Sequence, residues 1–197
     1  IPILGFLFKK GICPGCKKRI NKLYPFVELS TALLFGIASL YFMNSSVFFD
    51  TPYIPVLFFI FLAIVLYTSA TDLLIKAFSI RPLIAGTILS VVSCVFLNYP
   101  TNWLDSISAM GMGLGFFALI ALFGYFWKKT TVIGEGDFYL IAFLCSTLGV
   151  ASSIIALYVA ILLGAIIGGI ILVYNKARIL AFAPFLSVGW FIAYFHG

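Results

Sequence analysis

The sequence predicts an all-α fold, a polytopic membrane helix bundle, and three observations lead to this class. Of the 197 residues, 63% are hydrophobic and 9% are charged, whereas a soluble domain carries roughly 25% charged residues. Apolar runs long enough to cross a bilayer recur along the chain, and short polar segments separate them. All 12 Lys and Arg residues fall in alternate polar segments, which is the pattern that membrane topology imposes on basic residues.

We expect seven apolar runs to cross the membrane as helices. They cover residues 24–43, 52–71, 83–97, 107–127, 138–148, 154–174 and 179–195. A helix rises about 1.5 Å per residue, so about 20 residues span a hydrocarbon core of about 30 Å. The count of seven depends most on residues 138–148, the shortest run, which an expected turn at 149–153 separates from the next.

Glycines inside these runs predict close packing between helices. Gly111, Gly113 and Gly115 lie in the fourth run, and Gly164 and Gly168 form a GxxxG in the sixth. Small residues let helix backbones approach each other closely in membranes. The glycines of the fourth run do not indicate a phosphate-binding loop, because no strand precedes them.

The basic residues also predict the orientation of the chain. They lie in residues 1–23, 72–82, 128–137 and 175–178, whereas the alternate segments 44–51, 98–106 and 149–153 contain none. Positive residues accumulate on the cytoplasmic side of a membrane, so we expect a cytoplasmic N-terminus. The same charges are too few and too scattered to form the basic face of a nucleic-acid-binding protein, and we expect no nucleic-acid partner.

Two carboxylates, Asp72 and Asp137, lie at the ends of apolar runs on the predicted cytoplasmic side. Charged groups at such positions are costly, which makes them candidates for function. Two carboxyl groups that share one proton can cleave a peptide bond, because the ionised group activates water while the protonated group polarises the carbonyl. We therefore predict that this pair is catalytic in an aspartyl endopeptidase. The flanking Gly134 and Gly136 would allow an irregular turn and a close approach of substrate.

Each carboxylate also has a simpler interpretation. Asp137 opens an apolar run, where Asp is a preferred N-cap of a helix. Asp72 could pair with Lys76, four residues further along the chain. The corresponding functional alternative is a non-catalytic membrane scaffold or a proton-coupled transporter. The remaining candidates, Asp50 and Asp105, fall on the opposite side of the predicted topology and are therefore not expected to join the pair.

The cysteines form two groups. Cys13 and Cys16 have the CxxC spacing of zinc ligands, but a closed tetrahedral site needs four ligands. The only histidine, His196, is expected on the opposite side, so this pair is at most half of a zinc site, or two ordinary reduced thiols. Cys94 and Cys145 lie alone in apolar runs and are interpreted as small buried hydrophobic residues.

Several stretches of the chain resemble the type IV prepilin peptidases, which are membrane aspartyl proteases of the GxGD class. The stretches are Cys13-Pro14-Gly15-Cys16-Lys17 followed by Tyr24-Pro25-Phe26-Val27-Glu28-Leu29, then Thr71-Asp72-Leu73, Gly134-Glu135-Gly136-Asp137 and Pro184-Phe185-Leu186. The resemblance implies that Asp72 and Asp137 are the two catalytic residues. It also implies an eight-helix enzyme of the bacterial inner (cytoplasmic) membrane, of which seven helices are expected here, the first helix and first CxxC being absent.

The resemblance further implies a substrate and cofactors. Members remove the basic leader of type IV prepilins, or of the pseudopilins of type II secretion, at the cytoplasmic face. Many then N-methylate the new N-terminus with S-adenosylmethionine, which this chain needs only if it is an active methyltransferase. No cofactor is expected for proteolysis, and zinc is expected only through Cys13 and Cys16.

The expected organisation is a cytoplasmic juxtamembrane segment with the CxxC at residues 1–23, and a transmembrane aspartyl protease domain at 24–197. Two positions differ from the pattern of the resembled family. Phe78-Ser79 stands where Ile-Pro or Leu-Pro is common after the first Asp, and Tyr139 stands where a Lys is common after GxGD. These differences concern the range of substrates more than the carboxylate pair.

Overall fold

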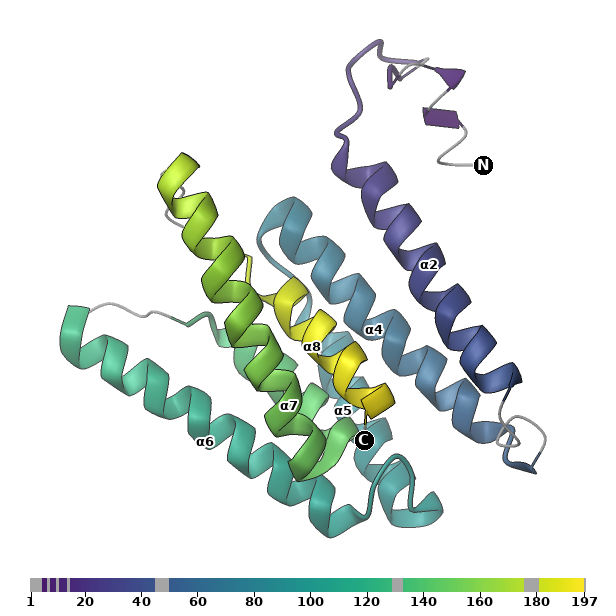
Figure 1. Cartoon of the computed structure of the whole chain (residues 1–197), viewed down its shortest axis with the longest axis vertical. Helices are drawn as coiled ribbons and strands as arrows, with labels where there is room; N and C mark the ends of the chain where they lie inside the picture. The colour runs from purple at the N-terminus through teal and green to yellow at the C-terminus, as the bar shows by residue number, and fades with distance from the viewer. Residues whose placement is uncertain are drawn as a thin grey trace. The chain divides into compact units, whose positions relative to one another are not determined.

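The structure is a computed structural model that describes residues 5–6, 8–9, 11–13, 15–44, 50–128, 133–175 and 181–196. Within them the chain forms the helices α2 (Leu23–Met43), α4 (Tyr53–Ile75), α5 (Ile80–Leu97), α6 (Trp103–Lys128), α7 (Glu135–Asn175) and α8 (Ala183–His196) (Figure 1). The β-type pairing among these residues is one isolated bridge, between Ile12 and Arg19. The predicted all-α fold is therefore confirmed.

Helices long and apolar enough to cross a membrane confirm the polytopic membrane class. Among the described residues there are five such segments: Leu23–Met43, Tyr53–Ile75, Ile80–Leu97, Trp103–Phe126 and Glu135–Ile170. The last of these contains the predicted crossing 138–148 and most of the predicted crossing 154–174. The count of seven crossings and the cytoplasmic N-terminus stay predictions. Parts of the predicted connections, residues 45–49, 129–132 and 176–180, lie outside the described residues.

The break inside α7 differs from the turn expected at residues 149–153. A single residue, Gly149, leaves the helical conformation, with φ 74° and ψ 177°, and Figure 1 shows the ribbon bending sharply between the two parts of the helix. Only glycine adopts such a backbone conformation readily. The expectation of a five-residue turn was wrong because the amide that follows, on Val150, finds an acceptor in Asp105 and the helix restarts at once.

The helices α6 and α7 begin three to four residues earlier than the apolar runs suggested. We expected residues 98–106 and 128–137 to lie between the helices, but α6 begins at Trp103 and α7 at Glu135. Acidic residues are favourable in the first turn of a helix, because its N-terminus carries a partial positive charge. Asp105 and Asp137 occupy the first turns of α6 and α7, so these polar residues belong to the helices rather than to the connections.

The chain divides into two compact units, an N-terminal unit (Ile1–Leu66) and a C-terminal unit (Tyr67–Gly197). The N-terminal unit contains α2 and the first part of α4, which pack through aromatic side chains. The rings of Phe35 and Phe59 stack with centroids 5.5 Å apart, and those of Phe42 and Phe58 lie 5.2 Å apart. This division by contacts does not test the predicted functional boundary at residue 24, which stays a prediction.

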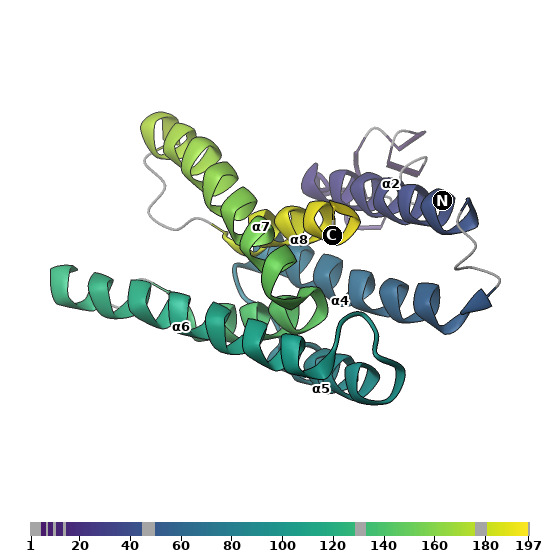
Figure 2. The same ribbon diagram turned by 60° about the horizontal axis from the view of Figure 1, so that its bottom comes forward.

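The C-terminal unit is built around α7, which contacts α5, α6 and α8. Figures 1 and 2 both show α7 between α6 and α8. The predicted close packing at Gly113 is confirmed, because a Cβ there would lie 3.0 Å from Cγ2 of Ile141. A Cβ at Gly111 or Gly115 would meet open space. Gly189 of α8 lies against the backbone of α7, a close approach that the sequence did not single out.

Polar side chains connect the helices around the first half of α7. Ser90 of α5 and Ser106 of α6 both donate hydrogen bonds to the backbone carbonyl of Ser146, at 3.0 and 2.8 Å. Nε1 of Trp190 in α8 donates to Oγ1 of Thr147 at 2.7 Å. Such bonds between helices satisfy polar groups that water does not reach. They fix the helix whose first turn carries Asp137.

Candidate active site

Asp72 lies in the last turn of α4 and is 9% exposed. Negative charge is unfavourable at the C-terminus of a helix, so this carboxylate needs a partner. The backbone N–H of Ala183 donates to Asp72 Oδ2 at 3.1 Å. Ala183 is the first residue of α8, where backbone N–H groups lack partners within the helix and the dipole is positive. The N-terminus of α8 therefore compensates the unfavourable position of Asp72.

A second polar contact holds α8 in this position. The side chains of Ser69 and Ser187 are hydrogen-bonded to each other, about one helical turn from Asp72 and Ala183 respectively. The Ser187 hydroxyl also donates to the Ala183 carbonyl at 2.8 Å. Both serines are buried. The end of α4 and the start of α8 are thus joined at two successive levels.

Asp137 is the third residue of α7 and is half-buried. Its backbone N–H donates to the Gly134 carbonyl at 3.1 Å. A Cβ added to Gly134 would lie 3.5 Å from Asp137 Oδ2, so the carboxylate turns back toward the start of its own helix. Because α7 begins at Glu135, Asp137 lies within the first turn rather than at the N-cap position that the simpler interpretation assigned to it.

Asp72 and Asp137 line the same cavity, which has a volume of about 440 Å³ and which we call the aspartate-pair cavity. Its lining residues are Asp72, Lys76, Ala77, Phe78, Ile80, Gly134, Glu135, Gly136, Asp137, Ala181 and Phe182. They come from the end of α4, the α4–α5 connection, the first residue of α5, the start of α7 and the stretch before α8, all within the C-terminal unit. Both carboxylates therefore belong to one cavity of the C-terminal unit. Lys76, the partner in the simpler interpretation of Asp72, lines it too.

Phe78 belongs to this site, although the sequence singled it out only as a difference from the resembled family. A Cβ on Gly136 would lie 2.7 Å from Cζ of the Phe78 ring. The ring therefore occupies the space that any side chain at position 136 would need. An aromatic residue in a short connection six residues after Asp72 was the available signal. The contact with Ala183 had no signal in the sequence.

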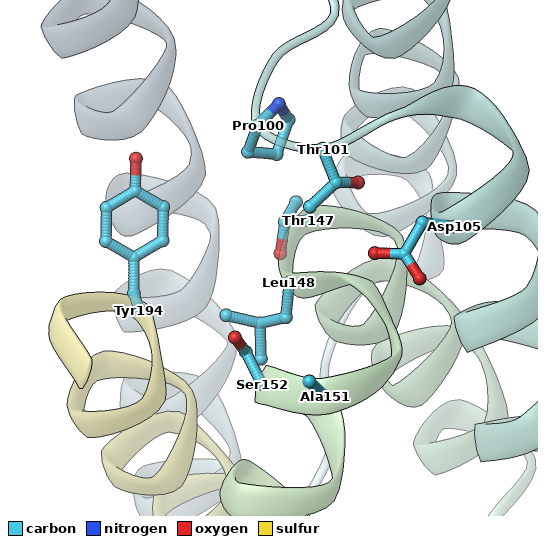
Figure 3. A pocket seen from close by; sticks show the side chains of 8 residues that line it. All are labelled: Pro100, Thr101, Asp105, Thr147, Leu148, Ala151, Ser152 and Tyr194. Atoms are coloured by element: carbon cyan, nitrogen blue, oxygen red, sulfur yellow. The ribbon is translucent and has the colours of Figure 1, made fainter. Parts of the chain in front are cut away.

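A second cavity of about 340 Å³ lies at the other end of α5 and α8, and we call it the Asp105 cavity (Figure 3). Its lining residues are Pro100, Thr101, Asp105, Thr147, Leu148, Ala151, Ser152 and Tyr194. Figure 3 shows Asp105 and Tyr194 on opposite sides of Leu148. Asp105 is the one acid among the described residues that line it. The cavity therefore offers no carboxylate pair.

Asp105 has a structural role at this end of the unit. Its Oδ1 atom accepts the backbone N–H of Val150 at 3.2 Å, so it caps the second part of α7 from a neighbouring helix. A Cβ on Gly149 would overlap the Asp105 carboxylate. The hydroxyls of Tyr99 and Tyr194 are hydrogen-bonded nearby, and burial raises the pKa of Tyr99 to about 12. These contacts indicate that Asp105 acts as a helix cap.

Cys13 and Cys16 lie in a tight turn of the N-terminal unit. The Cys13 N–H donates to the Lys18 carbonyl at 3.0 Å, and the Lys17 N–H donates to the Cys13 carbonyl at 2.9 Å. Hydrogen bonds from the backbone N–H of Cys16 and of Gly15 lower the pKa of the Cys13 thiol. Since the thiolate is the form that binds zinc, the turn fits half of a thiolate site. The described residues contain no group of three or more His, Cys, Asp or Glu that could hold a metal.

The chain is similar in sequence to one family model and to several known proteins. Residues 1–42 match the family model of the bacterial peptidase A24 N-terminal domain. The chain is 33% identical over 201 residues to the prepilin leader peptidase/N-methyltransferase of Bacillus subtilis. That alignment covers 100% of this chain and 75% of the Bacillus subtilis protein. The proteins of the same name from Neisseria gonorrhoeae and Dichelobacter nodosus are each 30% identical.

Coverage is also uneven between this chain and its relatives. The alignments cover 98% and 100% of this chain, but 64% of the Neisseria gonorrhoeae protein and 66% of the Dichelobacter nodosus protein. The chain thus spans about two thirds of the length of these two relatives. No solved structure matches the chain.

Proposed function

The chain belongs to the prepilin leader peptidase/N-methyltransferase family, and on this premise we propose that it is an aspartyl endopeptidase that removes the leader of a prepilin or pseudopilin. The observation that carries the proposal is that Asp72 and Asp137, which lie 65 positions apart in the sequence, line one cavity. The all-helical multi-pass fold supports a membrane-bound enzyme. We place it in the bacterial inner (cytoplasmic) membrane, with the cavity on the cytoplasmic side.

Asp72 and Asp137 share one proton in the proposed mechanism. The ionised carboxylate takes a proton from water, and the resulting hydroxide attacks the scissile carbonyl, whose oxygen accepts a hydrogen bond from the protonated carboxyl. The tetrahedral intermediate then collapses, and the amine leaves with a proton from the pair. Oδ2 of Asp72 accepts the Ala183 N–H, which holds this carboxylate at the cavity.

The lining of the aspartate-pair cavity supports a peptide substrate that is partly apolar. Phe78, Ile80 and Phe182 offer apolar surface, whereas the exposed residues Lys76 and Glu135 add charges to the lining. A peptide that leaves the membrane at this level could place its apolar part against the aromatic side chains and its polar part toward the charges. This arrangement suits cleavage at the end of a hydrophobic segment.

Zinc and S-adenosylmethionine have separate places in the proposal. Cys13 and Cys16 would supply two thiolates of a structural zinc site, which would stabilise the N-terminal turn without taking part in proteolysis. N-methylation of the new N-terminus would use S-adenosylmethionine as the methyl donor. It is proposed from the names of the relatives alone, and no residue is assigned to it.

The test is leader removal from a prepilin in cells that produce the full chain, followed by gel mobility and mass spectrometry. Asp72→Asn and Asp137→Asn keep the size of the side chains and remove the shared acid. We expect both variants to accumulate in the membrane and to leave the prepilin uncleaved. Asp50→Asn is the matched control, because Asp50 is an exposed acid outside the cavity. Normal processing by either cavity variant would favour the scaffold or transporter hypothesis instead.

A further inference from the structure

Phe78 lies in the aspartate-pair cavity between the segment that carries Asp72 and the segment that carries Asp137. It lies in the connection of residues 76–79 between α4 and α5, six positions after Asp72. It also lines the cavity together with both carboxylates. The side chain is half-buried, so one part of the ring contacts protein while another part faces the cavity.

The buried part of the ring contacts the first turn of α7 at Gly136. A Cβ at this position would lie 2.7 Å from Cζ and 2.8 Å from Cε2 of Phe78. These distances are shorter than carbon atoms reach without a shift of one group. The ring edge therefore sits directly on the glycine backbone, one residue before Asp137.

We propose that Phe78 is a positioning residue, whose ring against Gly136 sets the place of Asp137 relative to Asp72. This inference rests on the proposed function, because a separation between carboxylates matters only if they act as a pair. The short stretch that carries Asp72 thereby also determines the position of the second carboxylate. Gly136 is required in this arrangement because its lack of a side chain lets the ring approach the backbone.

Substitutions at position 78 and at position 136 should displace Asp137 for different reasons. A smaller residue at 78 removes the surface against which the first turn of α7 rests. A methyl group at 136 forces the ring and the first turn of α7 apart, which moves Asp137 away from the place that the ring sets. A displacement on the order of 1 Å between reacting groups can cost about a hundredfold in rate. Substrate binding depends on the whole cavity, so KM should change far less than kcat.

The experiment measures kcat and KM with the full chain and a full-length type IV prepilin, both reconstituted in proteoliposomes. The cavity variants are Phe78→Ala, Phe78→Leu, Phe78→Tyr, Gly136→Ala and the double variant Phe78→Leu with Gly136→Ala. Phe96→Ala and Gly111→Ala are matched controls, because Phe96 is 79% exposed and a Cβ at Gly111 would meet nothing within 4 Å. Activity is expressed per folded molecule, measured by size-exclusion chromatography.

We expect Phe78→Ala and Gly136→Ala to lower kcat by up to about a hundredfold with KM nearly unchanged. Phe78→Tyr should keep most of the activity, because it retains the ring. Adding Phe78→Leu to Gly136→Ala should restore activity by about tenfold, since the smaller side chain leaves room for the methyl group. Both controls should behave as the wild type.

Two results would overturn the inference while leaving the proposed function intact. One is a Phe78→Ala variant with the kcat of the wild type, and the other is a double variant no more active than Gly136→Ala alone. If Phe78→Ala does not fold, the double variant decides the matter alone. Failure of the proposed function is recognised separately, by cleavage in Asp137→Asn equal to that in the wild type.

Discussion

The two ends of the C-terminal unit use the same contact for different purposes. At one end, Asp72 of α4 accepts the N–H of Ala183 at 3.1 Å, and at the other, Asp105 of α6 accepts the N–H of Val150 at 3.2 Å. In both cases a carboxylate from one helix compensates the positive N-terminus of another helical segment. Each of these carboxylates also lines a cavity.

The two ends differ in the residues that surround each carboxylate. Asp137 lines the cavity of Asp72, whereas the described residues around Asp105 are hydroxyl-bearing and apolar side chains. A carboxylate that caps the N-terminus of a neighbouring helix thus has a structural role of its own. Chemistry becomes possible where the fold brings a second acid to the same cavity, and this distinguishes the candidate site from its structural counterpart.

The largest expected effect concerns the two carboxylates themselves. Asp72→Asn should lower cleavage of a prepilin by about 10²–10⁴-fold, because an amide cannot exchange the catalytic proton. Asp105→Asn should leave the rate per folded molecule unchanged, because its side-chain oxygen can still accept the Val150 N–H. The measurement is the initial rate of leader removal by equal amounts of purified variants. Equal losses in both variants would mean that the two ends do not differ as proposed.

The next effect concerns one glycine at each end. Gly149 has φ 74°, and a Cβ there would overlap the Asp105 carboxylate, so Gly149→Ala should destabilise the fold by about 1–3 kcal/mol or more. Gly136 is helical and its neighbour is a movable ring tip. Alanine there gains up to about 1 kcal/mol of helix propensity, which offsets the displacement of the ring. Thermal unfolding in detergent should therefore separate a destabilised Gly149→Ala from a Gly136→Ala variant of nearly normal stability.

One result would contradict the expected difference in stability between Gly136→Ala and Gly149→Ala. If Gly136→Ala unfolds at a temperature as low as Gly149→Ala, the first turn of α7 cannot accommodate the methyl group by moving Phe78. The role of Gly136 would then be general packing. Gly115→Ala provides the baseline, because a Cβ there meets nothing within 4 Å.

A smaller effect concerns the cap alone. Asp105→Ala removes the acceptor of the Val150 N–H, and loss of such a cap typically costs about 0.5–2 kcal/mol. Asp105→Asn keeps an acceptor oxygen and should cost less. Chemical or thermal unfolding of the two variants, compared with the wild type, gives the order directly. Equal stability of Asp105→Ala and the wild type would show that the restart of α7 after Gly149 does not depend on this contact.

The sequence predicted the class of fold and the placing of the two acids from elementary properties. Apolar length and the distribution of Lys and Arg indicated a multi-pass helical protein. The same alternation put Asp72 and Asp137 on one side, with two crossings between them, and the structure brings both to one cavity. Asp105 lines the other cavity, at the opposite end of α5 and α8.

Contacts between distant segments were beyond the reach of sequence patterns. Gly149 and the serines after it indicate a turn locally, but the Asp105 cap from another helix lets α7 restart within one residue. The ring of Phe78 on Gly136 and the N–H of Ala183 on Asp72 depend on how α4, α7 and α8 meet. Neither a spacing nor a composition carries that information.

The smallest effect concerns single hydrogen bonds along α8. Ser187→Ala removes the contact with Ser69 near Asp72, and Tyr194→Phe removes the contact with Tyr99 at the other end. Each loss should cost about 0.5–1.5 kcal/mol, so both variants should unfold at similar, slightly lower temperatures. Their activities should differ, because Ser187 helps to hold the N–H of Ala183 on Asp72. Cleavage by Ser187→Ala should be slower than by Tyr194→Phe at equal stability, and identical rates would mean that α8 holds its position at Asp72 through its other contacts.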